Sequence, residues 1–320
     1  MKKIMNLKTS LLLVCLILGS LSLFAADINN SAAAYIRMGI GARVIGMGEA
    51  GTAITKDITA AYWNPAGLME MKDIEFSSMY NLSMGYDRTY KYAALGKRFD
   101  FGVLALNWVN AGVEDIEGFN DLDQPTGFFG NQEHNIALSY ANRYKRLSFG
   151  ATPKLYLSTV DDDTEVGFGL DLGAKYDLSQ YFQAGLMVRD LVGTLADDTI
   201  PTQLALGVAG HPFMGVTIAA DLSLESSESP KLNFGGEYWT PIGRDPEADS
   251  QVSVVNMTER SSWDDILTNS QTGLRVGFNE GRFTVGTGLR FRSVQLDYAY
   301  RFGNHDIFND DHIISLILKF

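Results

Sequence analysis

The sequence has one cysteine among its 320 residues, and this residue, Cys15, lies near the N-terminus. Residues 1–26 have the pattern of a cleaved signal peptide, because a basic start precedes an apolar run over 11–24 and small residues close it. We expect export and cleavage to remove this stretch and to leave no cysteine. That would exclude disulfides, a thiol nucleophile and a cysteine-bound metal.

Basic charge is also scarce, with 26 Lys and Arg against 38 Asp and Glu and a formal net charge of −12. This balance argues against a nucleic-acid partner, whose phosphates require a basic surface. Long apolar runs are missing too, since after residue 26 none approaches the about 20 residues of a membrane-spanning helix. On composition alone, a soluble secreted protein and an outer-membrane barrel both remain possible.

The chain instead shows a period of two. In 294–302, VQLDYAYRF, apolar residues occupy every second position and polar or small residues fill the positions between, as in a strand with one apolar and one polar face. Fourteen segments follow this pattern: 74–84, 90–98, 101–110, 135–144, 147–159, 167–177, 182–188, 202–211, 215–224, 231–240, 271–278, 282–292, 294–302 and 312–320. Most are near the about 9–11 residues that a tilted strand needs to cross a membrane.

The polar face distinguishes a barrel from a soluble β-sandwich, whose strands also alternate. It is rich in glycine and carries both signs of charge, as a barrel lumen requires. The expected lumen charges are Asp171, Lys175, Asp221, Glu237, Arg275, Arg290, Arg292, Asp297, Arg301 and Lys319. The predicted fold is therefore all-β: a transmembrane antiparallel β-barrel of about 14 strands over 74–320, the even strand number being usual in bacterial outer membranes.

The connections alternate between long acidic loops, expected outside, and tight turns, expected on the periplasmic side. The longest outer loop is expected at 111–134. Aromatic residues near strand ends, as in the girdles at membrane interfaces, are Tyr80, Tyr90, Tyr140, Tyr144, Trp239 and Phe302. Residues 241–270 fall on the inner side and break the rule, so they are either a periplasmic insertion, with a short helix at 263–269, or contain a missed strand at 250–256.

The stretch 27–73 does not alternate and is expected to form a hatch inside the lumen, since fourteen strands enclose more space than wall side chains fill. Small residues over 39–68 would let its backbone pack against the wall. Asn64 and Pro65 fit an N-cap followed by proline at the first helical position, and Arg43 is the expected ion-pair partner of the wall. The candidate hatch residues are Gly41, Arg43, Gly46, Gly48, Trp63, Asn64, Pro65, Ala66 and Gly67. Whether the hatch is a door or a permanent seal stays open.

The stretch 41–68 resembles the N-terminal signature of the PorV/PorQ family, outer-membrane barrels of the fatty-acid-channel (FadL-like) type. The residues that carry the resemblance are Gly41-Ala42-Arg43, Gly46-Met47-Gly48, Ala60-Ala61-Tyr62-Trp63 and Asn64-Pro65-Ala66-Gly67-Leu68, with Gly236-Glu237-Tyr238-Trp239 and Gln295-Leu296-Asp297-Tyr298 further on. The resemblance implies fourteen strands, a lumenal hatch and the outer membrane of a Gram-negative-type bacterium.

Two functions remain open. The first, which the resemblance implies, is an accessory of type IX secretion that shuttles or anchors secreted cargo proteins. The alternative is a FadL-like channel for a hydrophobic small-molecule ligand such as a long-chain fatty acid, with the exposed-loop candidates Phe119, Phe128 and Phe129 starting a binding groove. A hydrolase is a remote alternative, because the four histidines lie in or beside predicted loops and turns.

No cofactor and no metal site are expected. Residues 46–51 match Gly-x-Gly-x-x-Gly, but no βαβ unit surrounds them, so we set dinucleotide binding aside. The acidic loops could bind Ca²⁺ or Mg²⁺, although solvated charge is the simpler interpretation. The expected partners are outer-membrane lipids and the barrel-assembly machinery, with Phe320 as the C-terminal assembly signal.

Overall fold

The structure is a computed structural model that describes residues 33–82, 88–120, 122–226, 228–242, 270–303 and 310–320. The predicted signal peptide, the strand candidate 250–256 and the helix candidate 263–269 lie outside these residues. Among the described residues, no helix is both long enough and apolar enough to cross a membrane.

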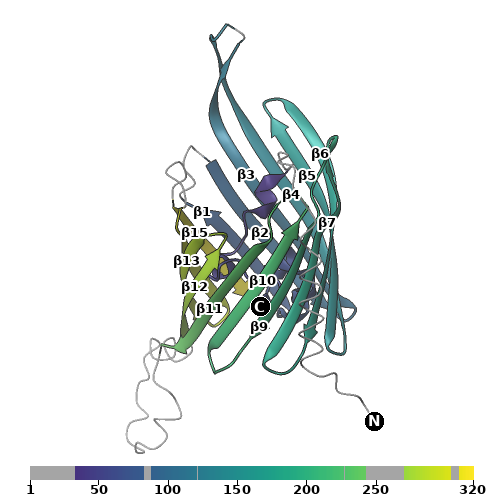
Figure 1. Ribbon diagram of the computed structural model, residues 1–320, viewed down its shortest axis with the longest axis vertical. Helices are drawn as coiled ribbons and strands as arrows, with labels where there is room; N and C mark the ends of the chain where they lie inside the picture. Colours follow the sequence, from purple (N-terminus) through teal and green to yellow (C-terminus); the bar gives the residue numbers. More distant parts are fainter. Residues whose placement is uncertain (1–32, 83–87, 121, 227, 243–269, 304–309) are drawn as a thin grey trace, which may run out of the picture.

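Fourteen antiparallel strands form a closed barrel (Figure 1). The strands are β1 Ile74–Asn81, β2 Arg88–Phe99, β3 Gly102–Phe119, β4 Pro125–Tyr144, β5 Leu147–Val160, β6 Asp163–Asp177, β7 Phe182–Leu195, β9 Gln203–Gly210, β10 Val216–Glu225, β11 Lys231–Pro241, β12 Ser270–Asn279, β13 Arg282–Phe291, β14 Val294–Arg301 and β15 Asp311–Lys319. Each pairs with its neighbours along the chain, and β1 closes the barrel by pairing with β15. The two-residue strand β8, Asp198–Thr199, only extends the edge of β7.

Along most of the wall, side chains alternate between its two faces. In β14, Gln295, Asp297 and Arg301 are buried inside the barrel, whereas Leu296 on the other face is 48% exposed. Large apolar side chains are exposed on the outer faces of most strands, among them Leu95, Leu106, Phe149, Phe168, Val276 and Leu289. A polar interior with an apolar exterior is the reverse of a soluble protein and suits a lipid environment.

Each of the fourteen predicted segments corresponds to one of these strands, with ends that differ by a few residues, but the expected loop at 111–134 was wrong. β3 runs on to Phe119 and β4 begins at Pro125, so this stretch is a paired hairpin that projects from one end of the barrel (Figure 1). The hairpin extends beyond the barrel and is exposed to solvent on both faces. It therefore lacks the alternation of apolar residues that identified the other strands. We call this end the hairpin end, and the opposite end the short-turn end.

Two of the predicted girdle aromatics face inward. Tyr90 is only 1% exposed, and Trp239 lines an internal pocket. Tyr80, Tyr140, Tyr144 and Phe302 are exposed.

Residues 33–73, here called the N-terminal segment, lie inside the barrel (Figure 1). They form four short helices: η1 Ala34–Arg37, α2 Ala42–Ile45, α3 Ala60–Trp63 and η2 Pro65–Glu70. Ile40, Ile58 and Leu68 are fully buried and pack with inward-facing Tyr90 and Tyr92 in the main hydrophobic core. The core of this protein therefore lies between the N-terminal segment and the wall.

Candidate functional site

The N-terminal segment contacts the inner face of every barrel strand. From β1 to β15 the wall residues that it bonds or closely approaches are Glu75, Gly96, Ser139, Gly150, Gly173, Gly185, Gly207, Asp221, Glu237, Gly277, Gly286, Arg301 and Ser315, while α3 packs against β3. A continuous ring of contacts therefore surrounds the segment across the whole width of the lumen.

Many wall residues that closely approach the segment are glycines, which we call the glycine ring: Gly96, Gly150, Gly173, Gly185, Gly207, Gly235, Gly277 and Gly286. A Cβ on Gly150 would come within 2.7 Å of the Pro65 carbonyl carbon, and one on Gly235 within 2.6 Å of that of Met47. These distances are far shorter than van der Waals contact, so the backbone of the segment fits against the wall only where side chains are missing.

Arg43 joins the segment to the wall through a buried charge chain. Its Nε and Nη2 each donate to a Glu237 carboxylate oxygen at 2.8 Å. Arg275 donates to the same carboxylate at 2.8 Å and lies 2.8 Å from Asp297. Such charges are stable inside a protein only when they are paired and hydrogen-bonded, as these are.

The turn at Asn64 and Pro65 is a second fixed point. Asn64 caps η2 by accepting from the Ala66 N–H at 3.2 Å, with Pro65 at the first helical position. Its side-chain NH₂ donates to the carbonyls of Thr52 at 2.8 Å and of Ala174 in β6 at 3.1 Å. One amide thus holds two parts of the segment against the wall.

The other candidate hatch residues are also packed. Gly41 has φ 75° and donates its N–H to Met79 Sδ at 3.0 Å, and the Trp63 indole donates to the Ile40 carbonyl at 3.0 Å. Gly46 lies against Gly286, Gly48 against Gly277, and Gly67 against the Thr55 carbonyl.

Most of the predicted lumen charges bind the segment or one another. Arg301 donates to Glu49 at 2.7 Å, Lys175 donates to the Thr55 carbonyl at 3.1 Å, and Asp221 accepts from the Thr52 N–H at 2.7 Å. Lys319 is half-buried and lies 3.9 Å from Glu75.

Arg292 was predicted wrongly, because it is exposed in the β13–β14 turn and lies over the Phe291 ring. The strand alternation stops at Phe291, and Arg292 takes the left-handed conformation of the turn, with φ 47°.

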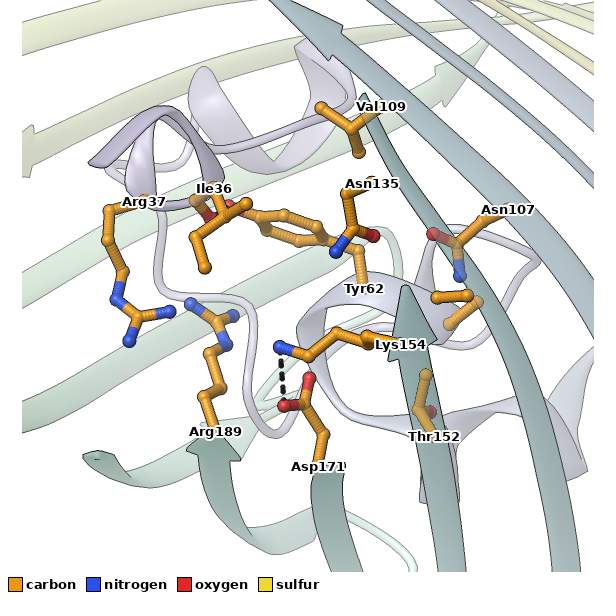
Figure 2. A pocket seen from close by; sticks show the side chains of 12 residues that line it. Ile36, Arg37, Tyr62, Asn107, Val109, Asn135, Thr152, Lys154, Asp171 and Arg189 are labelled. Atoms are coloured by element: carbon orange, nitrogen blue, oxygen red, sulfur yellow. Dashed lines mark hydrogen bonds and ion pairs between the residues drawn. The ribbon is translucent and has the colours of Figure 1, made fainter. Parts of the chain in front are cut away.

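On the hairpin side of the segment, a charge network fixes η1 to the wall. Arg37 contacts Asp190 at 2.9 Å and Glu225 at 3.3 Å, and it donates to the Pro201 carbonyl at 2.8 Å. Lys154 contacts both Asp190 and Asp171 at 2.6 Å. Figure 2 shows Lys154 and Asp171 facing each other beneath the Tyr62 ring.

A small pocket lies beside this network, with a volume of about 20 Å³, room for a single water molecule. Apolar groups line part of it (Ile36, Ala61, Val109 and Ala137), and polar groups line the rest (Arg37, Tyr62, Asn107, Asn135, Thr152, Lys154, Asp171 and Arg189; Figure 2). The guanidinium of Arg189 lies 4.9 Å from the centre of the Tyr62 ring and 5.3 Å from that of Trp63, a double cation–π contact.

The wall is irregular next to this pocket. Pro153 in β5 has no N–H to donate, and the pairing of β4 with β5 skips from Ala137–Lys154 to Tyr140–Ala151. In the neighbouring pair, Leu170 faces Val192 and Leu172 faces Val188, so residues 189–191 of β7 bulge opposite Asp171 alone. The bulge places Asp190, at φ 49°, inside the barrel.

Sequence reasoning missed Lys154, Arg37, Asp190 and Arg189. Lys154 shares the inward parity of Thr152 and Tyr156, so alternation could have identified it. Asp190 could not be found in this way, because the bulge resets the alternation.

The short-turn end holds a larger pocket of about 760 Å³. Arg43 and Lys56 of the segment form one side, and Trp239, Arg290, His211 and the β9–β10 turn form the other. The segment therefore lies between this pocket and the small one.

The described histidines bond residues other than serine: His134 bonds Trp108, His211 bonds Thr217 and His312 bonds Tyr298. No cluster of three or more His, Cys, Asp or Glu suited to a metal ion occurs in the described part of the chain.

No protein-family model and no curated protein sequence matches the chain. The structure is similar to that of the Ralstonia pickettii toluene transporter TbuX, with a TM-score of 0.61 and 12% identity over 88% of this chain and 98% of TbuX. For the Pseudomonas putida toluene transporter TodX, the TM-score is 0.60 and the identity 12% over 88% of this chain and 98% of TodX. For a Pseudomonas aeruginosa FadL homologue, the TM-score is 0.52 and the identity 10% over 92% of this chain and 99% of the homologue. These neighbours assign the FadL-like barrel fold, and the names of TbuX and TodX describe toluene transporters.

Proposed function

We propose that this protein is an outer-membrane channel that admits small hydrophobic molecules, monoaromatic hydrocarbons among them. The observation that carries the proposal is the irregular wall at Pro153 and the β7 bulge, which lies directly beside a lumenal pocket in a barrel of the toluene-transporter fold. This favours the channel for hydrophobic small molecules over the accessory of type IX secretion.

In this proposal the hairpin end faces the outside and the N-terminal segment seals the lumen. A ligand would enter from the hairpin end, reach Tyr62 and Ile36 at the small pocket, and leave sideways where the bulge interrupts the pairing of β6 with β7. Movement of the whole segment would break contacts with all fourteen strands, including the Arg43–Glu237 pair. A local opening of the wall disrupts far fewer, so the lateral route is favoured.

A disulfide across the irregular strand pair tests the route. Leu170 and Val192 face each other on the outer side, so Leu170→Cys with Val192→Cys would fasten β6 to β7 beside the bulge. We expect oxidised cells to take up radiolabelled toluene no faster than a strain lacking the gene, and a reductant to restore uptake.

The matched control fastens the same strands where their pairing is regular, with Ala174→Cys and Leu186→Cys. This variant should keep wild-type uptake in both redox states. Unchanged uptake in the oxidised Leu170–Val192 variant would reject the lateral route, and equal uptake with and without the gene would reject the channel.

Export of cargo proteins remains the second candidate. Beside the sequence resemblance it has one structural observation: Phe119, Leu122 and Phe128 at the tip of the β3–β4 hairpin are 57%, 76% and 71% exposed, as on a surface that binds another protein. Loss of surface cargo in the deletion strain, with toluene uptake unchanged, would favour this function over the channel.

A further inference from the structure

The pocket at the short-turn end lies on the far side of the N-terminal segment from the proposed ligand path. Its volume of about 760 Å³ is in the range of small-molecule sites. Tyr181, Phe213, Met214 and Trp239 give it apolar surface, and Phe213 and Met214 are 76% and 98% exposed in the β9–β10 turn. The pocket therefore offers an apolar body a place to bind, in addition to its charged groups.

Arg290 is a cation held in place by neutral groups. Its guanidinium lies 4.1 Å from the centre of the Trp239 ring. Its Nε and Nη2 donate to Gln295 Oε1 at 3.1 and 3.0 Å, and its Nη1 donates to Gln271 Oε1 at 3.1 Å. Proteins usually place a carboxylate beside such a cation. Here amide oxygens fix its position, and among the described residues no carboxylate forms an ion pair with it.

The surrounding charges leave the pocket positive. Glu237 is the only carboxylate among the described lining residues, and Arg43 and Arg275 already occupy both of its oxygens. Lys56 is exposed on the segment side of the pocket, and within the described residues neither it nor Arg290 forms an ion pair. Burial, together with the charges of Lys56 and Arg43, lowers the pKa of His211 below its ordinary value, as expected in a positive environment.

We propose that this pocket binds a small organic monocarboxylate with an apolar body, such as an aromatic acid. The carboxylate would accept hydrogen bonds from the remaining N–H groups of Arg290 and from Lys56, and the ring would lie against Trp239 and Tyr181. A planar guanidinium matches a carboxylate in two parallel hydrogen bonds, and its prior fixation reduces the entropy lost on binding. This site takes an anion, whereas the proposed channel takes an uncharged hydrocarbon.

The test is calorimetric titration of the purified full-length protein in detergent with benzoate, with its uncharged analogue benzyl alcohol, and with inorganic phosphate. We expect benzoate to bind with a stoichiometry of one and the other two to bind at least about tenfold more weakly, the usual scale of a charge-assisted hydrogen bond. Arg290→Gln and Lys56→Gln should each weaken benzoate binding by about tenfold or more.

Arg292→Gln is the matched control, because it removes the same charge two residues away on the outside of the pocket and should bind benzoate as the wild type does. A β-sheet circular dichroism spectrum like that of the wild type confirms that each variant is folded. Equal binding of benzoate and benzyl alcohol would overturn the proposal, as would unchanged binding in Arg290→Gln or phosphate binding as strong as that of benzoate. None of these results depends on toluene uptake, so this site and the channel can fail separately.

Discussion

Arg43 is the residue whose removal should most loosen the N-terminal segment. Its pair with Glu237 is buried, so Arg43→Met leaves one carboxylate with a single remaining cation, Arg275. Breaking a buried pair typically costs about 3 kcal/mol, and we expect a clear fall in the thermal unfolding midpoint of the detergent-solubilised barrel.

The control for Arg43 is an ion pair at the surface. Lys231 lies 2.9 Å from Glu280 with both side chains partly exposed, and water screens such a pair. Lys231→Met should change the midpoint little. If the two variants have the same thermal unfolding midpoint, the Arg43–Glu237 pair contributes no more to stability than a surface ion pair.

The residue scale also shows what alternation can and cannot predict. Parity alone places Asp171, Asp221 and Glu237 inside, and the same rule places Trp239 on the face of Glu237, against its assignment to the outer girdle. The prediction that Arg292 lies in the lumen was wrong, because the alternation of side chains does not show where a strand ends. Pairings such as Arg43 with Glu237 could not be read from the sequence, because they depend on the path of the segment across the lumen.

At the scale of elements, the glycine ring determines where the segment can lie. Gly235 and Gly236 are adjacent in β11 but face opposite ways. A Cβ on Gly235 would meet the Met47 backbone at 2.6 and 2.7 Å, whereas one on Gly236 would meet only the Thr217 carbonyl, at 3.9 Å. The two positions therefore differ in contact with the segment while sharing a strand.

We expect Gly235→Ala to displace the segment and open a leak. Overpacking of this kind typically costs about 1–3 kcal/mol, enough to populate open states. In planar lipid bilayers, Gly235→Ala should raise the frequency of conducting events well above that of the wild type, and Gly236→Ala should not. Equal conductance in the two variants would mean that the close fit at Gly235 does not seal the lumen.

The hairpin shows the limit of sequence reasoning at this scale. Fourteen strands were predictable because each must present alternate faces to lipid and lumen. Beyond the barrel end, β3 and β4 meet water on both faces, so the alternation that predicts a strand disappears although the backbone pairing continues. The β7 bulge escapes prediction for a related reason, since its extra residues shift parity without any change in composition.

For the whole molecule, the question is whether the N-terminal segment can move to open the lumen or seals it permanently. Its contacts with all fourteen strands, and a hydrophobic core that lies between segment and wall, favour a permanent seal. A seal of this kind should persist without its covalent link to β1. Lys72 and Asp73 are exposed just before β1, so a protease site inserted between them can be cut in the folded protein.

After cleavage we expect the N-terminal fragment to stay with the barrel through size-exclusion chromatography, and bilayer conductance to remain as low as before. The same cleavage in the Gly235→Ala variant should let part of the fragment dissociate and raise the conductance, because the added Cβ weakens the fit at Met47. Release from the otherwise unaltered barrel would instead show that the covalent link holds the segment in place. The segment would then be free to move as a door, and the lateral route through the β5–β7 wall would lose its main argument.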